Sequence, residues 1–161
     1  MIREASHSDS IAIAGIYNYY ILNTSVTFEL EPVTHEEISR RMENYKLLGP
    51  YLVYEEDNEV VGYSYVSKFR DRQAYNNSCE STIYIKKGYG GKGIGYKLYS
   101  GLLSEVILRY HVVIGGISLP NAASVRLHEK IGFKKVGHFC EVGKKFGKWV
   151  DVGFWQLTAK K

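Results

Sequence analysis

The 161-residue sequence predicts a single α/β domain in which helices flank a mostly antiparallel sheet with one parallel strand–helix–strand crossover. Residues 51–56 and 60–69 are rich in β-forming side chains, and a turn-forming Asp-Asn pair separates them, which is typical of an antiparallel hairpin. Residues 79–85 precede a glycine-rich loop and a helical pattern, and the unbroken apolar run at residues 112–119 follows. This second set forms one right-handed crossover and therefore requires a parallel pair.

Two helices are predicted before the hairpin. Capping boxes mark their starts, at Ser6 with Asp9 and at Thr34 with Glu37. The first helix is expected to end near Asn23, and Gly49-Pro50 ends the second. Residues 24–32 are then a connection between helices.

The C-terminal third predicts one short helix and two strands. Pro120-Asn121 ends the apolar strand, a helix covers residues 122–131, and Gly132 closes it. Residues 134–142 and 148–157 are predicted strands on either side of a turn at Gly147.

Composition restricts the class of protein. An apolar fraction of 45% with 24% charged residues suits a globular chain with a buried core. A net charge of +4 without a basic stripe disfavours nucleic acid and favours a small anionic ligand. No apolar run approaches the roughly 20 residues of a membrane span, and the N-terminal residues do not resemble a signal peptide, so we expect a cytoplasmic protein that binds no membrane.

The cysteines and histidines predict no metal site. Cys79 and Cys140 lack a CxxC or Cys/His ligand spacing, and two cysteines are too few for a disulfide framework. Four histidines have no partner at a functional spacing and are assigned no role, namely His7, His35, His111 and His138.

Residues 88–95 include five glycines and open a helix, a combination that lets backbone N–H groups and the helix dipole bind a phosphate. A Walker loop is excluded because Ile94 follows Gly93 where Lys and Ser or Thr are required. A dinucleotide fold is disfavoured because residues 112–119 end without an acidic residue and the crossover is single. The third candidate ligand is a CoA pyrophosphate, which the resemblance described next implies.

Gly90-Gly91-Lys92-Gly93-Ile94-Gly95 resembles the acetyl-CoA loop of the GNAT N-acetyltransferases, with Gly90 where that family usually has Gln or Arg. Residues 121–124 and 127–133 are similar to a second GNAT motif, in which His128 stands at a Tyr position. The phosphinothricin and methionine sulfoximine acetyltransferases are similar over nearly the whole chain, in residues 16–18, 27–32, 74–75, 80–85 and 145–157.

The resemblance implies the GNAT fold, acetyl-CoA as co-substrate and direct attack by the amine of a small amino-acid-like compound. It implies Glu80 as the general base and His128 as a candidate general acid toward the CoA thiolate. The implied cofactor-binding residues are Ile83, Tyr84 and Ile85 through their backbone, then Gly90, Gly91, Lys92, Gly93, Ile94, Gly95, Asn121 and Ser124.

The implied acceptor pocket has aromatic walls and a cationic end. Arginine can bind a carboxylate or phosphinate in bidentate fashion, which suits Arg70 and Arg72, and Phe28 and Tyr75 would be the walls. Resembling enzymes associate, and the aromatic tail Phe154-Trp155 is more than the edge strand of a monomer usually carries, so we expect a homodimer. The sequence leaves the amine open, and another small amine, a protein N-terminus or a non-catalytic acyl-CoA sensor stays an alternative.

Overall fold

The computed structural model describes residues 1–160, and in this part of the chain one seven-stranded sheet has the order β1-β2-β3-β4-β5-β7-β6. Its strands are β1 (Ile2–Glu4), β2 (Tyr51–Glu56), β3 (Glu59–Lys68), β4 (Ser78–Ile85), β5 (Val112–Leu119), β6 (Lys134–Lys145) and β7 (Lys148–Thr158). The helices are α1 (Ser10–Asn23), α2 (His35–Lys46), α3 (Ile94–Arg109) and α4 (Ala122–Ile131), with short 3-10 turns η1 (His7–Asp9) and η2 (Gln73–Tyr75). The predicted mixed fold is confirmed.

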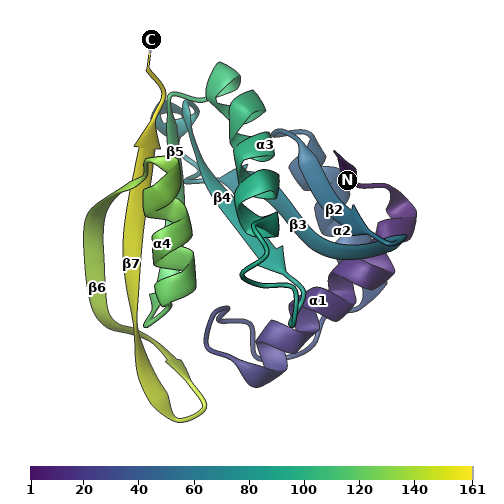
Figure 1. Ribbon diagram of the computed structural model, residues 1–161. Coiled ribbons are helices and arrows are strands. Elements are labelled where there is room, and N and C mark those ends of the chain that lie inside the picture. The colour runs from purple at the N-terminus through teal and green to yellow at the C-terminus, as the bar shows by residue number, and fades with distance from the viewer. Residues whose placement is uncertain (161) are drawn as a thin grey trace.

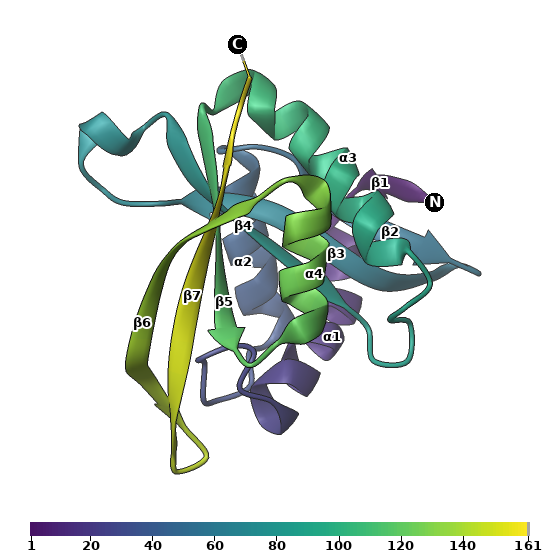
Figure 2. The same cartoon turned by 60° about the vertical axis from the view of Figure 1, so that its left-hand side comes forward.

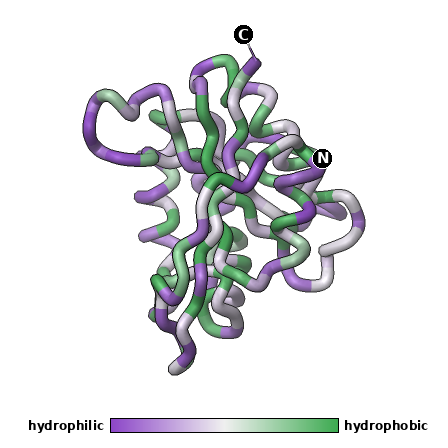
Figure 3. Tube along the Cα trace, turned by 90° about the vertical axis from the view of Figure 1, so that its left-hand side faces the viewer, coloured by the Kyte–Doolittle hydropathy of each residue, from purple (hydrophilic) through white to green (hydrophobic). Residues whose placement is uncertain are grey.

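Helices cover both faces of the sheet. Figure 1 shows α3 and α4 on the near face, with α1 and α2 on the far side. One apolar cluster packs α3 against the sheet around Leu98, Tyr99 and Leu102, and a second packs α1 and α2 against β2 and β3. Hydrophilic residues predominate in the loop between β3 and β4, which projects from the molecule in Figures 2 and 3.

The sequence signals that start and stop elements act as expected. At the first helix the Ser6–Asp9 capping box begins η1, which continues directly into α1. The Thr34 side chain accepts the N–H of Glu37 at 3.2 Å at the start of α2. Gly132, with a φ of 115°, ends α4 in the left-handed conformation that a glycine adopts without a steric penalty.

The parallel pair is short, and its two strands then diverge. β4 pairs with β5 at three positions, from Ser78 opposite Val112 to Glu80 opposite Ile114. Beyond Glu80, β4 stays paired with β3, whereas β5 is paired with β7 over its whole length. The sheet therefore opens between the two strands, as the diverging ribbons of Figure 2 show.

Three features differ from the expectations. β1 was not predicted, because three residues are too few to show a period. β6 extends three residues past the predicted end, through a bulge between Phe139 and Gly143. β7 lies inside the sheet rather than at its edge, and Trp155 is buried, so this aromatic residue is no argument for association.

No helix within residues 1–160 is long and apolar enough to cross a bilayer.

Candidate active site

A cavity of about 270 Å³ lies where β4 and β5 diverge. β4 contributes residues 80–84 and β5 contributes residues 116–118. The loop after α1 contributes residues 26–28, and further walls come from α4 and β7. The open part of the sheet is therefore a pocket lined by both polar and apolar residues.

Glu80 stands at the point where the parallel pairing stops. Its side chain points into the cavity while that of its neighbour Cys79 is buried in the core, as strand alternation requires. The Glu80 carboxylate approaches β5 at Gly116, where an added Cβ would lie 3.3 Å from Oε1. Burial raises the pKa of Glu80, because a charge is poorly solvated there. The carboxylate is thus a stronger base than an exposed one.

Cys79 has no comparable reactivity. Burial raises the pKa of its thiol to about 12, so the nucleophilic thiolate is scarce at neutral pH. Covalent catalysis through this residue is therefore disfavoured.

His128 lies on α4 with both ring nitrogens in hydrogen bonds. Its Nδ1 lies 2.8 Å from the Ser124 carbonyl oxygen, and its Nε2 lies 3.1 Å from the Tyr99 hydroxyl. Because a carbonyl can only accept, Nδ1 carries the proton and Nε2 accepts from Tyr99. The Tyr99 hydroxyl also lies 2.6 Å from the Ser81 hydroxyl, which completes a buried chain from α4 to β4.

This environment keeps the His128 imidazole neutral. Burial lowers its pKa, so the ring holds no extra proton at neutral pH. Gly115 lets the ring approach the sheet, because a Cβ there would lie 2.6 Å from Nε2. The geometry therefore suits a positioning role for His128 better than donation of a proton by an imidazolium.

The free edge of β4 offers backbone groups to a ligand. The Ile85 carbonyl accepts the Tyr20 hydroxyl at 2.6 Å, whereas the N–H of Lys86 donates back to Val61 on β3. Because strand groups alternate in direction, the N–H and C=O of Ile83 point to the same open side as those of Ile85. Tyr84 points its backbone to β3, and its side chain packs against the rings of Tyr17 and Tyr20.

The glycine-rich loop leads from β4 into α3, as predicted. Gly88, Gly91 and Gly93 have φ between 77° and 90°, a conformation that side chains disfavour. Gly93 is the N-cap of α3 without a side-chain cap, which leaves the first N–H groups of the helix, from Ile94 and Gly95, free for an anion.

Cations lie near this loop. The Lys92 ammonium lies 4.8 Å from the Tyr89 ring centre and that of Lys87 lies 5.0 Å from the ring of Tyr19. Either lysine can supply a positive charge in place of the side chain that Gly90 lacks. The loop therefore has the backbone donors and the positive charge that a pyrophosphate requires.

The start of α4 brings further predicted residues to the cavity. Asn121 and Ser124 both line it together with His128, and the Asn121 side chain caps α4 by accepting the N–H of Ser124 at 3.2 Å. The three residues share one helix face, because residues three and four positions apart lie on the same side of a helix.

Phe28 is the predicted acceptor residue that the structure brings to the cavity. Its ring packs on Gly143 of β6, where an added Cβ would lie 2.4 Å away. The buried Lys145 ammonium donates a hydrogen bond at 2.8 Å to the carbonyl of Thr27, the residue before Phe28. The loop after α1, which forms one wall of the cavity, is therefore fixed to the end of β6.

Arg70, Arg72 and Tyr75 lie elsewhere, on or beside the loop between β3 and β4. None of the three lines the cavity formed by residues 1–160, and all three are exposed. The Arg70 guanidinium stacks 5.8 Å from the Tyr75 ring centre. Their assignment to the acceptor pocket thus stays a prediction from resemblance.

Sequence reasoning missed other cavity residues, of which Ser118, Val152 and Phe154 stand out. The Ser118 hydroxyl is buried and has no hydrogen-bond partner among residues 1–160. Alternation from Phe154 along β7 could have identified Val152, but nothing in the sequence showed that this strand borders the opening.

A sheet that opens beside an uncapped helix N-terminus and a half-buried carboxylate suits transfer of an acyl group from a phosphate-bearing carrier. The chain belongs to the GNAT acetyltransferase family, because the Acetyltransferase (GNAT) domain matches residues 2–153.

Named relatives and solved structures agree with this family. A phosphinothricin N-acetyltransferase of Streptomyces coelicolor is 37% identical over 96% of this chain and 94% of its own. An L-methionine sulfoximine/L-methionine sulfone acetyltransferase of Salmonella typhimurium is 37% identical over 97% of this chain and 92% of its own. The structure of an acetyltransferase from Salmonella typhimurium with its cofactor acetyl-CoA has a TM-score of 0.97 at 36% identity, covering 100% of this chain and 94% of its own.

Proposed function

We propose that the protein transfers the acetyl group of acetyl-CoA to the primary amine of a small amino-acid-like compound of the phosphinothricin or methionine sulfoximine type. The observation that carries the proposal is the half-buried Glu80 carboxylate, with its raised pKa, inside the cavity between β4 and β5. The names of relatives that match over nearly the whole chain support the substrate class.

The proposed reaction begins with proton transfer to Glu80. An aliphatic ammonium cannot attack a thioester, and a carboxylate with a raised pKa accepts its proton directly or through one water. The free amine then attacks the acetyl carbon. The C–S bond breaks and the CoA sulfur leaves as a thiolate. The attacking nitrogen gives up its second proton to solvent to become the amide, and solvent can protonate the thiolate.

The free edge of β4 and the start of α3 are the proposed contacts of acetyl-CoA. The backbone N–H of Ile83 would stabilise the oxyanion or hold the pantetheine, and the N–H groups of Ile94 and Gly95 would bind the pyrophosphate. His128 is proposed to hold Tyr99 and Ser81 in place beside β4. In this role His128 gives no proton to the leaving thiolate. A thiol with a reference pKa of about 8.5 is a good leaving group without help.

Turnover tests this proposal. We expect CoA release from acetyl-CoA with phosphinothricin, methionine sulfoximine or methionine sulfone, and little with arylamines or peptide N-termini. A protein that binds acetyl-CoA but acetylates none of a panel of small amino acids would instead be the acyl-CoA sensor.

Association into a homodimer is part of the proposal, and the β6–β7 hairpin supports it. Large apolar side chains more than half exposed gather on this edge of the sheet, at Val136, Phe139, Val142, Phe146 and Trp149. Such a set is unusual on a monomer surface, and edge strand β6 also offers free backbone groups. A cytoplasmic location is proposed with it, since both Cys79 and Cys140 are thiols.

A further inference from the structure

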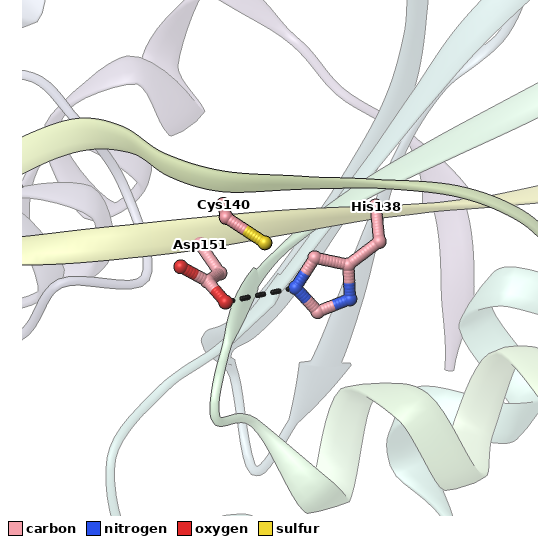
Figure 4. A group of neighbouring side chains, drawn as sticks. All are labelled: His138, Cys140 and Asp151. Atoms are coloured by element: carbon pink, nitrogen blue, oxygen red, sulfur yellow. Dashed lines mark hydrogen bonds and ion pairs between the residues drawn. The ribbon is translucent and has the colours of Figure 1, made fainter.

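Three potential metal ligands meet on the β6–β7 hairpin, outside the cavity. Figure 4 shows His138 and Cys140 from β6 pointing toward Asp151 of β7. One nitrogen, one sulfur and one oxygen from these side chains all lie within 4.8 Å of one another. None of the three residues lines the acetyl-transfer cavity within the described part of the chain.

The β6 bulge produces this arrangement. Strand alternation puts His138 and Cys140 on one face, and the ladder to β7 is interrupted between Phe139 and Gly143. Glu141 adopts a φ of 51° in the bulge, and its backbone N–H donates to Asp151 Oδ1 at 2.8 Å. The carboxylate is thereby anchored through one oxygen, and its second oxygen faces His138.

We propose that His138, Cys140 and Asp151 bind a divalent transition-metal ion of the Zn²⁺ type. A thiolate and an imidazole select such an ion over Mg²⁺ or Ca²⁺, which prefer oxygen ligands. Three protein ligands leave a fourth tetrahedral position for water. The Glu141–Asp151 hydrogen bond orients one ligand, as outer contacts of metal ligands commonly do.

Small movements would complete the site. Tetrahedral zinc bonds of about 2.0–2.3 Å place ligand atoms roughly 3.3–3.7 Å apart. His138 Nε2 and Asp151 Oδ2 are 2.8 Å apart and must separate slightly, while Cys140 rotates inward. All three side chains are at least partly exposed, so these movements disturb no packed core.

Zinc binding moves the protons of two ligand side chains, those of His138 and Cys140. The Lys135 ammonium lies 3.0 Å from His138 Nδ1 and can only donate, so Nε2 carries the ring proton and donates to Asp151. Binding therefore needs Lys135 to swing away, the ring proton to pass to Nδ1 by exchange with solvent, and the Cys140 thiol proton to leave to solvent. One proton is released for each ion bound.

The ion would brace β6 to β7 where backbone pairs are missing. β7 carries Val152 and Phe154 into the cavity from its other face, so the brace would act on the hairpin and not on the reacting groups. We expect Zn²⁺ to raise the unfolding temperature, since a ligand that binds the native state stabilises it.

The test uses the untagged, chelator-treated full chain titrated with Zn²⁺ against a chromophoric chelator. The wild type should bind one equivalent, and Cys140→Ser and His138→Gln should each bind more than about 100-fold more weakly, beyond the range seen for outer-contact losses. His35→Gln is the matched control, because His35 is also an exposed histidine beside a carboxylate, that of Glu36 at 3.1 Å. This control should bind like the wild type.

Cobalt substitution gives a readout independent of affinity. Co²⁺ should produce a thiolate charge-transfer band in the wild type and in His35→Gln but not in Cys140→Ser. Cys79 cannot supply that band, since it is buried in the core. Equal zinc affinity in the wild type and Cys140→Ser, or a wild type that binds no zinc, would overturn the proposal whatever the acetyltransferase activity.

Discussion

Glu80 shows how the position of one residue in the sheet sets the acidity of its side chain. Glu80 stands where backbone pairing between β4 and β5 ends, so its carboxylate is shielded from bulk water without being packed in the core. The raised pKa that makes it a better base also costs stability at neutral pH, because the unfolded chain ionises more easily. Such a cost is common at catalytic positions.

Ser118→Ala tests whether the unpartnered hydroxyl in the cavity contacts a substrate. If it does, the KM of acetyl-CoA or of the amine should rise about 2- to 12-fold, as expected for one hydrogen bond of roughly 0.5–1.5 kcal/mol. Ser64→Ala is the matched control, because the Ser64 hydroxyl is also buried without a partner in residues 1–160 but lies outside the cavity. Steady-state kinetics with unchanged constants in both variants would remove Ser118 from the site.

The loop before α3 and the loop after α1 are the elements that shape the two ends of the site. The shape of the first loop depends on glycine conformation. The second loop is held by side-chain hydrogen bonds and ion pairs between residues distant in the sequence. Asn18 exchanges two hydrogen bonds with the backbone of Val33, and Arg41 forms a two-pronged ion pair with Glu29. The cavity wall is therefore held in place before substrate binds, which lowers the entropy cost of binding.

Gly90→Asp should block acetyl-CoA binding. Gly90 lacks the positive φ of its neighbours and has open space around it, so the fold should tolerate a side chain there. The added negative charge should repel a pyrophosphate, while Gly90→Ala should bind nearly as well as the wild type. Calorimetry with acetyl-CoA measures both, and wild-type affinity in Gly90→Asp would disprove the loop assignment.

Lys145→Met should loosen the wall that carries Phe28. The lost hydrogen bond from a buried ammonium to Thr27 is of the charge-assisted kind, worth about 1.5–3 kcal/mol. The KM of the amine should rise at least several-fold, while that of acetyl-CoA should stay nearly unchanged. Lys144→Met is the control, since Lys144 is exposed and stacks on Trp149. An equal rise in both KM values would show a general loss of structure instead.

Across the whole molecule, the sequence predicts those features whose signals are local. Capping boxes, Gly132 and the glycine-rich loop gave correct element boundaries because their effects are local. The place of β7 between β5 and β6 was not predictable, because strand order depends on long-range pairing. The cluster of His138, Cys140 and Asp151 was missed for the same reason, since a bulge and a cross-strand register bring them together.

For the molecule as a whole, the exposed apolar side chains on the β6–β7 hairpin predict a homodimer. Light scattering should give twice the 18.3 kDa mass of one chain. Val142→Ser combined with Trp149→Ser should shift the protein toward a monomer, because both side chains are more than half exposed in the single chain. A wild type that stays at 18.3 kDa over the accessible concentration range would refute the prediction.

The pH dependence of turnover in Glu80→Gln tests the central claim, that Glu80 is the base of an acetyl transfer. Burial raises the Glu80 pKa, so the wild-type rate should rise with pH as the carboxyl loses its proton and becomes able to accept one. Glu80→Gln should be slower by about 10²–10⁴-fold at neutral pH with unchanged acetyl-CoA affinity, and the deficit should shrink at alkaline pH, where the amine deprotonates itself. Glu105→Gln on α3, which is exposed, should match the wild type. Full activity of Glu80→Gln at neutral pH, or the same deficit at every pH, would contradict the assignment of Glu80 as the base.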